Sequence, residues 1–191
     1  MKSIVDNTLS VILSGDYIQM SIRGYFCYNL LMKNIRNTTK KIIEKFIFEQ
    51  QTITFAESCT GGRIAAEFTA VSGASNILLG SVVTYSNKIK HQWLGVTLET
   101  LEKEGAVSKA CVEEMLDGVQ KLADSDYAIA VSGIAGPTGG TEFKPVGTVY
   151  IGIKTPFSKK TFHCHFNGSR EEVQEQSVVF AIEKLAEAIN F

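Results

Sequence analysis

The sequence predicts an α/β fold with a mixed, mainly parallel sheet flanked by helices in three layers. Strand-like and helix-like segments alternate along most of the chain, which is the pattern of parallel βαβ units. The run at 127–132 is almost continuously apolar, as expected for a central strand buried on both faces. Two later strand-like runs, 146–154 and 160–166, are joined by a short turn and predict an added antiparallel hairpin.

The composition predicts one globular domain that carries an appendage. The chain has 191 residues, of which 45% are hydrophobic, and this is ample for a core. Its 19 basic and 20 acidic residues nearly cancel. No broad charge therefore favours nucleic acid or an anionic membrane as a partner. Any site for an anion must be local.

The four cysteines are scattered, with no C-x-x-C pair and no spacing typical of a metal site. Reduced thiols and a cytoplasmic location fit this usage best. The apolar run at 11–13 is far too short for a signal peptide, and no stretch approaches the roughly 18 apolar residues of a membrane helix. The sequence therefore predicts neither secretion nor membrane insertion.

Residues 1–35 are expected to form an N-terminal appendage of unknown role, ahead of a domain at 36–191. Up to about residue 34 the apolar residues follow no sustained period. One hypothesis places the native start at Met32, and a peptide covering 1–31 in the endogenous protein would contradict it. The alternative is an arm that packs on the domain or on a neighbouring subunit.

Hydrophobic periodicity and capping residues predict the order of elements within the domain. Apolar residues at helical spacing indicate an amphipathic helix at 38–49, and a strand at 52–55 leads through a polar turn into a helix at 62–70. The later expected elements are a strand at 80–86, a helix from 87 capped by Ser86 or Asn87, a short helix from 98 to about 105, a helix capped by Ser108, and a final helix capped by Ser169 that reaches about 189.

The polar turn at 58–62, Ser-Cys-Thr-Gly-Gly, is the first candidate for chemistry. Its small side chains and glycines let a ligand approach the backbone. Unpaired amides at the start of the following helix would attract anions and developing oxyanions. The alternative is that the hydroxyls of this turn only cap the helix.

Ser58, Tyr85, Lys90 and Ser132 all follow the carboxyl ends of predicted strands, where open α/β sheets bind ligands. Taken alone, Tyr85 would be a core or interface tyrosine and Lys90 a surface lysine. The glycine-rich segment 133–140 could bring amides close to a ligand, but it fits no phosphate-loop motif. These residues together indicate a site at one edge of the sheet.

His163 and His165 share one face of a predicted strand and could ligate a metal ion. Exposed strand histidines are more common than metal ligands, and no third ligand is evident. We therefore expect no metal and no other cofactor.

Four segments in the same order strongly resemble the CinA carboxy-terminal family: AESCTGG at 56–62, VVTYSNKIK at 82–90, SGIAGP at 132–137 and KPVGTVY at 144–150. The resemblance covers roughly residues 36 to 191. It implies a nicotinamide-nucleotide amidohydrolase that converts nicotinamide mononucleotide to nicotinate mononucleotide and ammonia in pyridine-nucleotide salvage. It also implies a homodimer, with a small pyridine nucleotide as the ligand.

Carried onto matching positions, the resemblance makes Ser58 the nucleophile, with Lys90 and Tyr85 activating it. The substrate-binding residues it implies are Thr60, Gly61, Gly62, Ser132, Gly133 and Arg170, with Arg170 as the anchor. Ser132 departs from the threonine typical of its position, although a hydroxyl is kept. Gln174 stands where a second arginine is common in the family.

The expected mechanism needs a neutral Lys90 to accept the proton of the Ser58 hydroxyl. The backbone amides around Gly61 and Gly62 are expected to stabilise the oxyanion. Cys59 is a rival nucleophile, because a helix start lowers a thiol pKa, but its side chain should point away from that of Ser58. Two other functions stay open, namely a non-catalytic pyridine-nucleotide-binding or regulatory module and a hydrolase of another amide.

Overall fold

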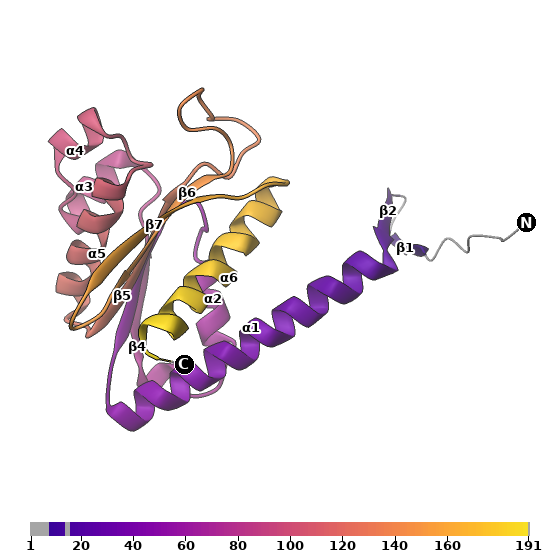
Figure 1. Cartoon of the computed structure of the whole chain (residues 1–191), viewed down its shortest axis with the longest axis horizontal. Coiled ribbons are helices and arrows are strands. Elements are labelled where there is room, and N and C mark those ends of the chain that lie inside the picture. The colour runs from indigo at the N-terminus through magenta and orange to yellow at the C-terminus, as the bar shows by residue number, and fades with distance from the viewer. Residues whose placement is uncertain (1–7, 14–15, 191) are drawn as a thin grey trace, which may run out of the picture.

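The computed structural model describes residues 8–13 and 16–190, with side chains from Asn34 to Asn190. This part of the chain forms a five-stranded sheet between two layers of helices, preceded by a two-stranded sheet (Figure 1). The elements in chain order are β1 Thr8–Leu13, β2 Asp16–Ser21, α1 Ile22–Glu49, β3 Ile53–Glu57, α2 Arg63–Thr69, the 3-10 turn η1 Ala74–Asn76, β4 Leu78–Val83, α3 Asn87–Leu94, α4 Leu98–Lys103, α5 Lys109–Ala123, β5 Tyr127–Gly133, β6 Thr148–Lys154, β7 Lys159–His165 and α6 Arg170–Ala188.

The large sheet has the strand order β4-β3-β5-β6-β7. Strand β3 pairs in parallel with β4 and with β5. Strands β6 and β7 form the predicted hairpin, and β6 pairs antiparallel with β5. The mixed sheet is therefore confirmed, with its parallel pairs on the side where the candidate residues lie.

Helices cover both faces of this sheet. In Figure 1, α1, α2 and α6 lie on one face, and α3, α4 and α5 lie on the other. The buried apolar residues form one cluster on each side, and the strands contribute to both because their side chains alternate between faces. The three predicted layers are therefore present.

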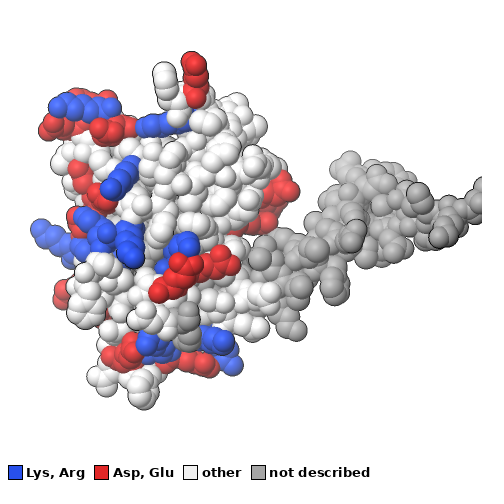
Figure 2. Space-filling model, in the orientation of Figure 1, with Lys and Arg blue, Asp and Glu red and all other residues white. Residues whose placement is uncertain are grey.

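Charged side chains of both signs are interspersed over the face that Figure 2 shows. This distribution agrees with the near balance of 19 basic and 20 acidic residues in the sequence. Among the described residues, no helix combines the length and the apolar character needed to cross a membrane.

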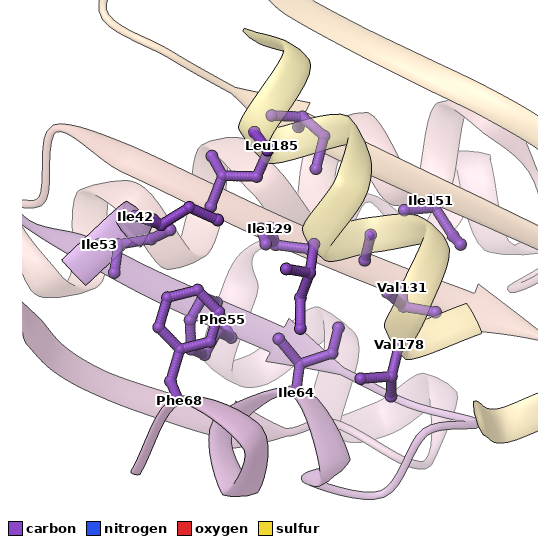
Figure 3. Close-up of a cluster of buried hydrophobic side chains, with 14 of the residues drawn as sticks. Ile42, Ile53, Phe55, Ile64, Phe68, Ile129, Val131, Ile151, Val178 and Leu185 are labelled. Atoms are coloured by element: carbon purple, nitrogen blue, oxygen red, sulfur yellow. The ribbon is translucent and has the colours of Figure 1, made fainter. Parts of the chain in front are cut away.

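Strand β3 illustrates why these residues form a buried strand. Its five residues are all buried, and Phe55 lies with its ring centroid 4.9 Å from that of Phe68 in α2. Figure 3 shows Phe55 and Ile53 beside Ile42 of α1 and Phe68 of α2. Ala56 belongs to the cluster on the opposite face. The strand is thus held by both helical layers, and its last residue is followed directly by Ser58.

Helix α1 differs from the sequence prediction. It begins at Ile22 rather than near residue 38, so the expected boundary at 35/36 lies inside a continuous helix. Gly24 and several aromatic and β-branched residues weaken the helical signal there, yet no proline interrupts it. The strands β1 and β2 that precede it were not predicted. The start at Met32 remains a prediction.

Gly118 sets the distance between α5 and α3, and this leads to a test. A Cβ built on Gly118 would lie 1.9 Å from the carbonyl oxygen of Leu94, the last residue of α3. Because the obstacle is backbone, we expect Gly118→Ala to cost about 3 kcal/mol in overpacking. The helix propensity of alanine returns about 1 kcal/mol, so the net loss is about 2 kcal/mol.

Urea unfolding would measure the effect of Gly118→Ala. The matched control is Gly80→Ala in β4, because nothing lies within 4 Å of a Cβ at Gly80. Equal stability of the two variants would contradict the close contact between α3 and α5.

Candidate active site

The end of strand β3 sends neighbouring side chains to opposite faces of the sheet. Ser58 points to the α3 side, where its Oγ lies 2.9 Å from Lys90 Nζ. Glu57 and Cys59 point to the α2 side: the Glu57 carboxylate accepts from amides that lead into α2, and Cys59 joins the hydrophobic cluster of that face. This alternation, a consequence of strand geometry, separates the hydroxyl of Ser58 from the thiol of Cys59.

Lys90 reaches Ser58 from the first turns of α3. Ser86 caps this helix by accepting from the amide of Ile89, so one of the two predicted caps is confirmed. The side chain of Lys90 is only 1% exposed. Its Nζ donates to Ser58 Oγ at 2.9 Å and to the carbonyl oxygen of Thr84 at 2.6 Å. The structure therefore brings together two residues that are 32 positions apart in the chain.

Burial controls the protonation of this site. Desolvation lowers the pKa of Lys90 from its ordinary value of 10.5, which favours the neutral amine that a base needs. The same effect raises the pKa of Cys59 to about 12, so its thiol stays protonated. The site thus favours a hydroxyl nucleophile over the neighbouring thiol.

Tyr85 lies close to the site but contacts a different partner from the one expected. Its side chain is 63% exposed, and its hydroxyl accepts from Arg170 Nη2 at 2.9 Å. Among the described contacts, no hydrogen bond joins it to Ser58 or Lys90. In the described contacts the carbonyl of Thr84 orients the amine, and a role for Tyr85 in activating Ser58 stays a prediction.

Arg170, the first residue of α6, connects three segments that follow different strands. Its Nη1 donates to the carbonyl of Gly136 in the glycine-rich segment at 2.9 Å, and its Nη2 donates to Tyr85. Ser169 caps α6, as predicted, and the structure adds a capping box with Glu172. A guanidinium has five donors, so Arg170 keeps capacity for a ligand.

The amides expected to stabilise an oxyanion are already occupied. The amide of Gly62 donates to Glu57 Oε2 at 2.9 Å, and that of Gly61 donates to the carbonyl of Ser58 at 3.1 Å. Gly62 is the N-cap of α2 in a left-handed conformation, with no side chain capping it. The alternative that a turn hydroxyl caps α2 is wrong, since Glu57 fills the helix start. Substrate binding by Gly61 and Gly62 stays a prediction.

The other implied binding residues have structural partners. The buried hydroxyl of Thr60 donates to Glu57 Oε2 at 2.7 Å. Ser132 is buried and donates to the carbonyl of Ala106, just ahead of α5, at 2.7 Å. A Cβ at Gly133 would lie 2.7 Å from a methyl of Val149. Substrate binding by Thr60, Ser132 and Gly133 stays a prediction.

Gln174 and Glu57 are the residues that sequence reasoning undervalued. Gln174 Nε2 donates to the carbonyl of Cys59 at 2.6 Å and ties α6 to the Ser58 turn. An acidic residue at the end of an apolar strand, directly before a turn of small residues, was the signal that could have identified Glu57.

His163, a candidate metal ligand in the sequence, stacks on Tyr150 with ring centroids 4.6 Å apart. The described residues contain no cluster of three or more potential metal ligands.

Comparison with known proteins agrees with this arrangement. The family model of the CinA C-terminal domain matches residues 35–189. The chain belongs to the CinA C-terminal domain family. A CinA-like protein of Endomicrobium trichonymphae is 47% identical over 162 residues, which are 82% of this chain and 38% of that protein. One of Pseudothermotoga lettingae is 53% identical over 141 residues, or 74% of this chain and 34% of that protein. The chain thus spans well under half the length of these CinA-like relatives.

Solved structures of the CinA superfamily share the fold. Competence damage-inducible protein A of Klebsiella pneumoniae has a TM-score of 0.78 and 38% identity, over 81% of this chain and 96% of that chain. A competence/damage inducible protein of Agrobacterium tumefaciens has a TM-score of 0.79 and 36% identity, over 82% of this chain and 96% of that chain. The recognition of the CinA family from four short segments is therefore confirmed.

Proposed function

We propose that this CinA domain hydrolyses the carboxamide of nicotinamide mononucleotide to nicotinate mononucleotide and ammonia, with residues 36–191 as the amidohydrolase domain. The observation that supports it most is the contact of 2.9 Å between Lys90 Nζ and Ser58 Oγ, with both residues buried. A serine hydroxyl needs an adjacent group that accepts its proton. A buried amine whose pKa is lowered is such a group.

Lys90 is arranged to act as the base. A neutral amine has two N–H groups and one lone pair, and the carbonyl of Thr84 accepts from one N–H at 2.6 Å. The lone pair can then accept the proton of the Ser58 hydroxyl across the existing contact of 2.9 Å. Thr84 thereby holds the base in place without adding charge.

In the first step Ser58 Oγ bonds to the carboxamide carbon as its proton passes to Lys90. The protonated Lys90 then gives a proton to the departing nitrogen, which leaves as ammonia, and a nicotinoyl ester remains on Ser58. Water attacks this ester, its proton returns through Lys90 to the serine oxygen, and the carboxylate product leaves.

The oxyanion of each tetrahedral intermediate needs donors other than Gly61 and Gly62. Among the described residues, no backbone carbonyl accepts from the amides of Cys59 and Thr60. The amide that follows a nucleophilic serine is the usual donor in strand-turn-helix sites. We assign this role to Cys59 and Thr60, where loss of one donor typically costs about 10² to 10³ in rate.

Arg170 is the proposed anchor for the phosphate of the nucleotide. We expect Arg170→Ala to raise KM for nicotinamide mononucleotide by about 10- to 100-fold, because a hydrogen bond to a charged group contributes about 1.5–3 kcal/mol. Steady-state kinetics would measure KM and kcat separately. The matched control is Lys109→Ala, which removes an exposed cation at the first residue of α5 instead. An unchanged KM in Arg170→Ala would show that the phosphate binds elsewhere.

Release of ammonia from nicotinamide mononucleotide by the purified full chain tests the proposed function. Binding of the nucleotide without ammonia release would select the non-catalytic binding or regulatory module. Release of ammonia only from other compounds in a panel of amides would show that the chain is a hydrolase of another amide. Sedimentation of the same sample would test the homodimer that the resemblance implies.

A further inference from the structure

Glu57 is a fully buried carboxylate that the proposed mechanism does not use. It is the last residue of β3 and lies directly before Ser58. Four donors from the next eight residues converge on it. Oε2 accepts from Thr60 Oγ1 at 2.7 Å and from the amides of Gly62 and Ile64 at 2.9 and 3.2 Å, and Oε1 accepts from the amide of Ala65 at 3.0 Å.

These four hydrogen bonds explain how the Glu57 carboxylate can be fully buried. An unpaired buried carboxylate is very costly, whereas one that accepts several N–H and O–H groups is stabilised. The first amides of a helix have no partner within the helix and carry partial positive charge. Glu57 supplies that partner for α2 from within the chain, so no external anion is needed there.

The same contacts define the turn that carries the nucleophile. Residues 58–62 run between the last residue of β3 and the start of α2, and the Glu57 carboxylate joins these two ends. Two further bonds hold the middle of the turn: the amide of Gly61 donates to the carbonyl of Ser58, and Gln174 donates to that of Cys59. Ser58 thus points toward Lys90 from a turn whose two ends are joined by a carboxylate on the opposite face of the sheet.

We propose that Glu57 is a positioning residue for Ser58, and that its carboxylate is an internal anion that fills the start of α2 and keeps the Ser58 oxygen at contact distance from Lys90. This inference rests on the proposed function for its chemistry, but the geometry can be tested without that reaction. Glutamine in place of Glu57 keeps the shape and replaces one acceptor oxygen with an N–H₂ group. That group would face the amide donors of the turn and push them apart.

The test measures the nucleophilicity of Ser58 directly in the full chain. A fluorophosphonate bonds through phosphorus to a nucleophilic serine oxygen, fluoride leaves, and the serine proton passes to the base. Mass spectrometry of the Ser58 peptide gives both the rate constant of labelling and the final labelled fraction. We expect Glu57→Gln to lower the rate constant about 100-fold, the effect of a displacement of roughly 1 Å at a reacting atom. The labelled fraction at completion should stay unchanged, and so should KM for nicotinamide mononucleotide.

The matched control is Glu67→Gln. Glu67 is also a buried carboxylate of the α2 region, but it pairs with Arg36 at 2.5 and 2.8 Å, away from the turn. We expect this variant to melt at a lower temperature while Ser58 is labelled at the wild-type rate. A purely structural role for Glu57 would instead reduce the labelled fraction and leave the rate constant per labelled site unchanged.

Thr60→Val provides a second, milder variant that removes one donor to Glu57 and keeps the side-chain shape. We expect labelling about 10-fold slower, as for loss of one charge-assisted hydrogen bond. Wild-type rate constants in both Glu57→Gln and Thr60→Val would overturn the positioning role. If the wild-type chain is labelled at Ser58 but releases no ammonia, the amidase proposal fails while the role of Glu57 is still decided by the labelling rates.

Discussion

Alanine in place of Ser58 is expected to lower kcat for hydrolysis of nicotinamide mononucleotide by about 10⁴-fold or more, since the loss of a serine nucleophile has effects of this order. The variant keeps Lys90 and the binding residues, so the nucleotide should still bind. An ammonia-release assay and calorimetric titration would measure the two properties. The small side chain of Ser58 is buried against Lys90, so we expect no loss of the fold.

Cys59→Ala is the control for this experiment. Its thiol is buried in the cluster on the opposite face of the sheet, and burial raises its pKa to about 12. We therefore expect nearly wild-type kcat, with a modest loss of stability from the smaller side chain. Activity that survives Ser58→Ala but disappears in Cys59→Ala would identify the cysteine as the nucleophile.

Methionine in place of Lys90 is expected to lower kcat by about 10³-fold, within the range for loss of a general base. In the wild-type chain kcat/KM should rise with pH as Lys90 loses its proton. Because burial lowers the pKa of Lys90, this rise should be centred below 10.5. Pre-steady-state and steady-state rates across pH would show the rise in the wild type and a flat residual rate in the variant. The same rise in both would mean that another group is the base.

The Lys90 replacement also changes how stability depends on pH. Between the lowered folded pKa and the ordinary value of 10.5, the unfolded chain binds more protons at Lys90 than the folded chain does. The free energy of unfolding should therefore rise with pH across this window in the wild type. Lys90→Met removes this dependence and should be more stable than the wild type below the window.

Urea unfolding at several pH values would measure this difference. Lys88→Met is the matched control, because Lys88 lies in the same helix and is exposed. We expect its unfolding free energy to follow the wild-type pH dependence. A parallel curve for Lys90→Met would contradict a lowered pKa at Lys90.

Local features of the chain were sufficient to predict most of the elements. Ser86, Ser108 and Ser169 each cap a helix through a bond to an amide three residues later, and such bonds depend on neighbouring residues alone. The buried strand at 127–132 was recognisable because a strand covered on both faces is apolar throughout. Helix α1 was underestimated, since its first half has weak intrinsic helix preference.

The sequence by itself determined the alternation of strands and helices, the family, and the presence of a serine and a lysine beyond strand ends. Only the tertiary structure decided which of the candidate groups contact one another and which are buried. The burial of Lys90, the bond of Tyr85 to Arg170 and the use of the turn amides by Glu57 join residues from different elements. Such contacts depend on how layers pack around the sheet, because solvent exclusion and hydrogen-bond competition are properties of the assembled fold and not of any short segment.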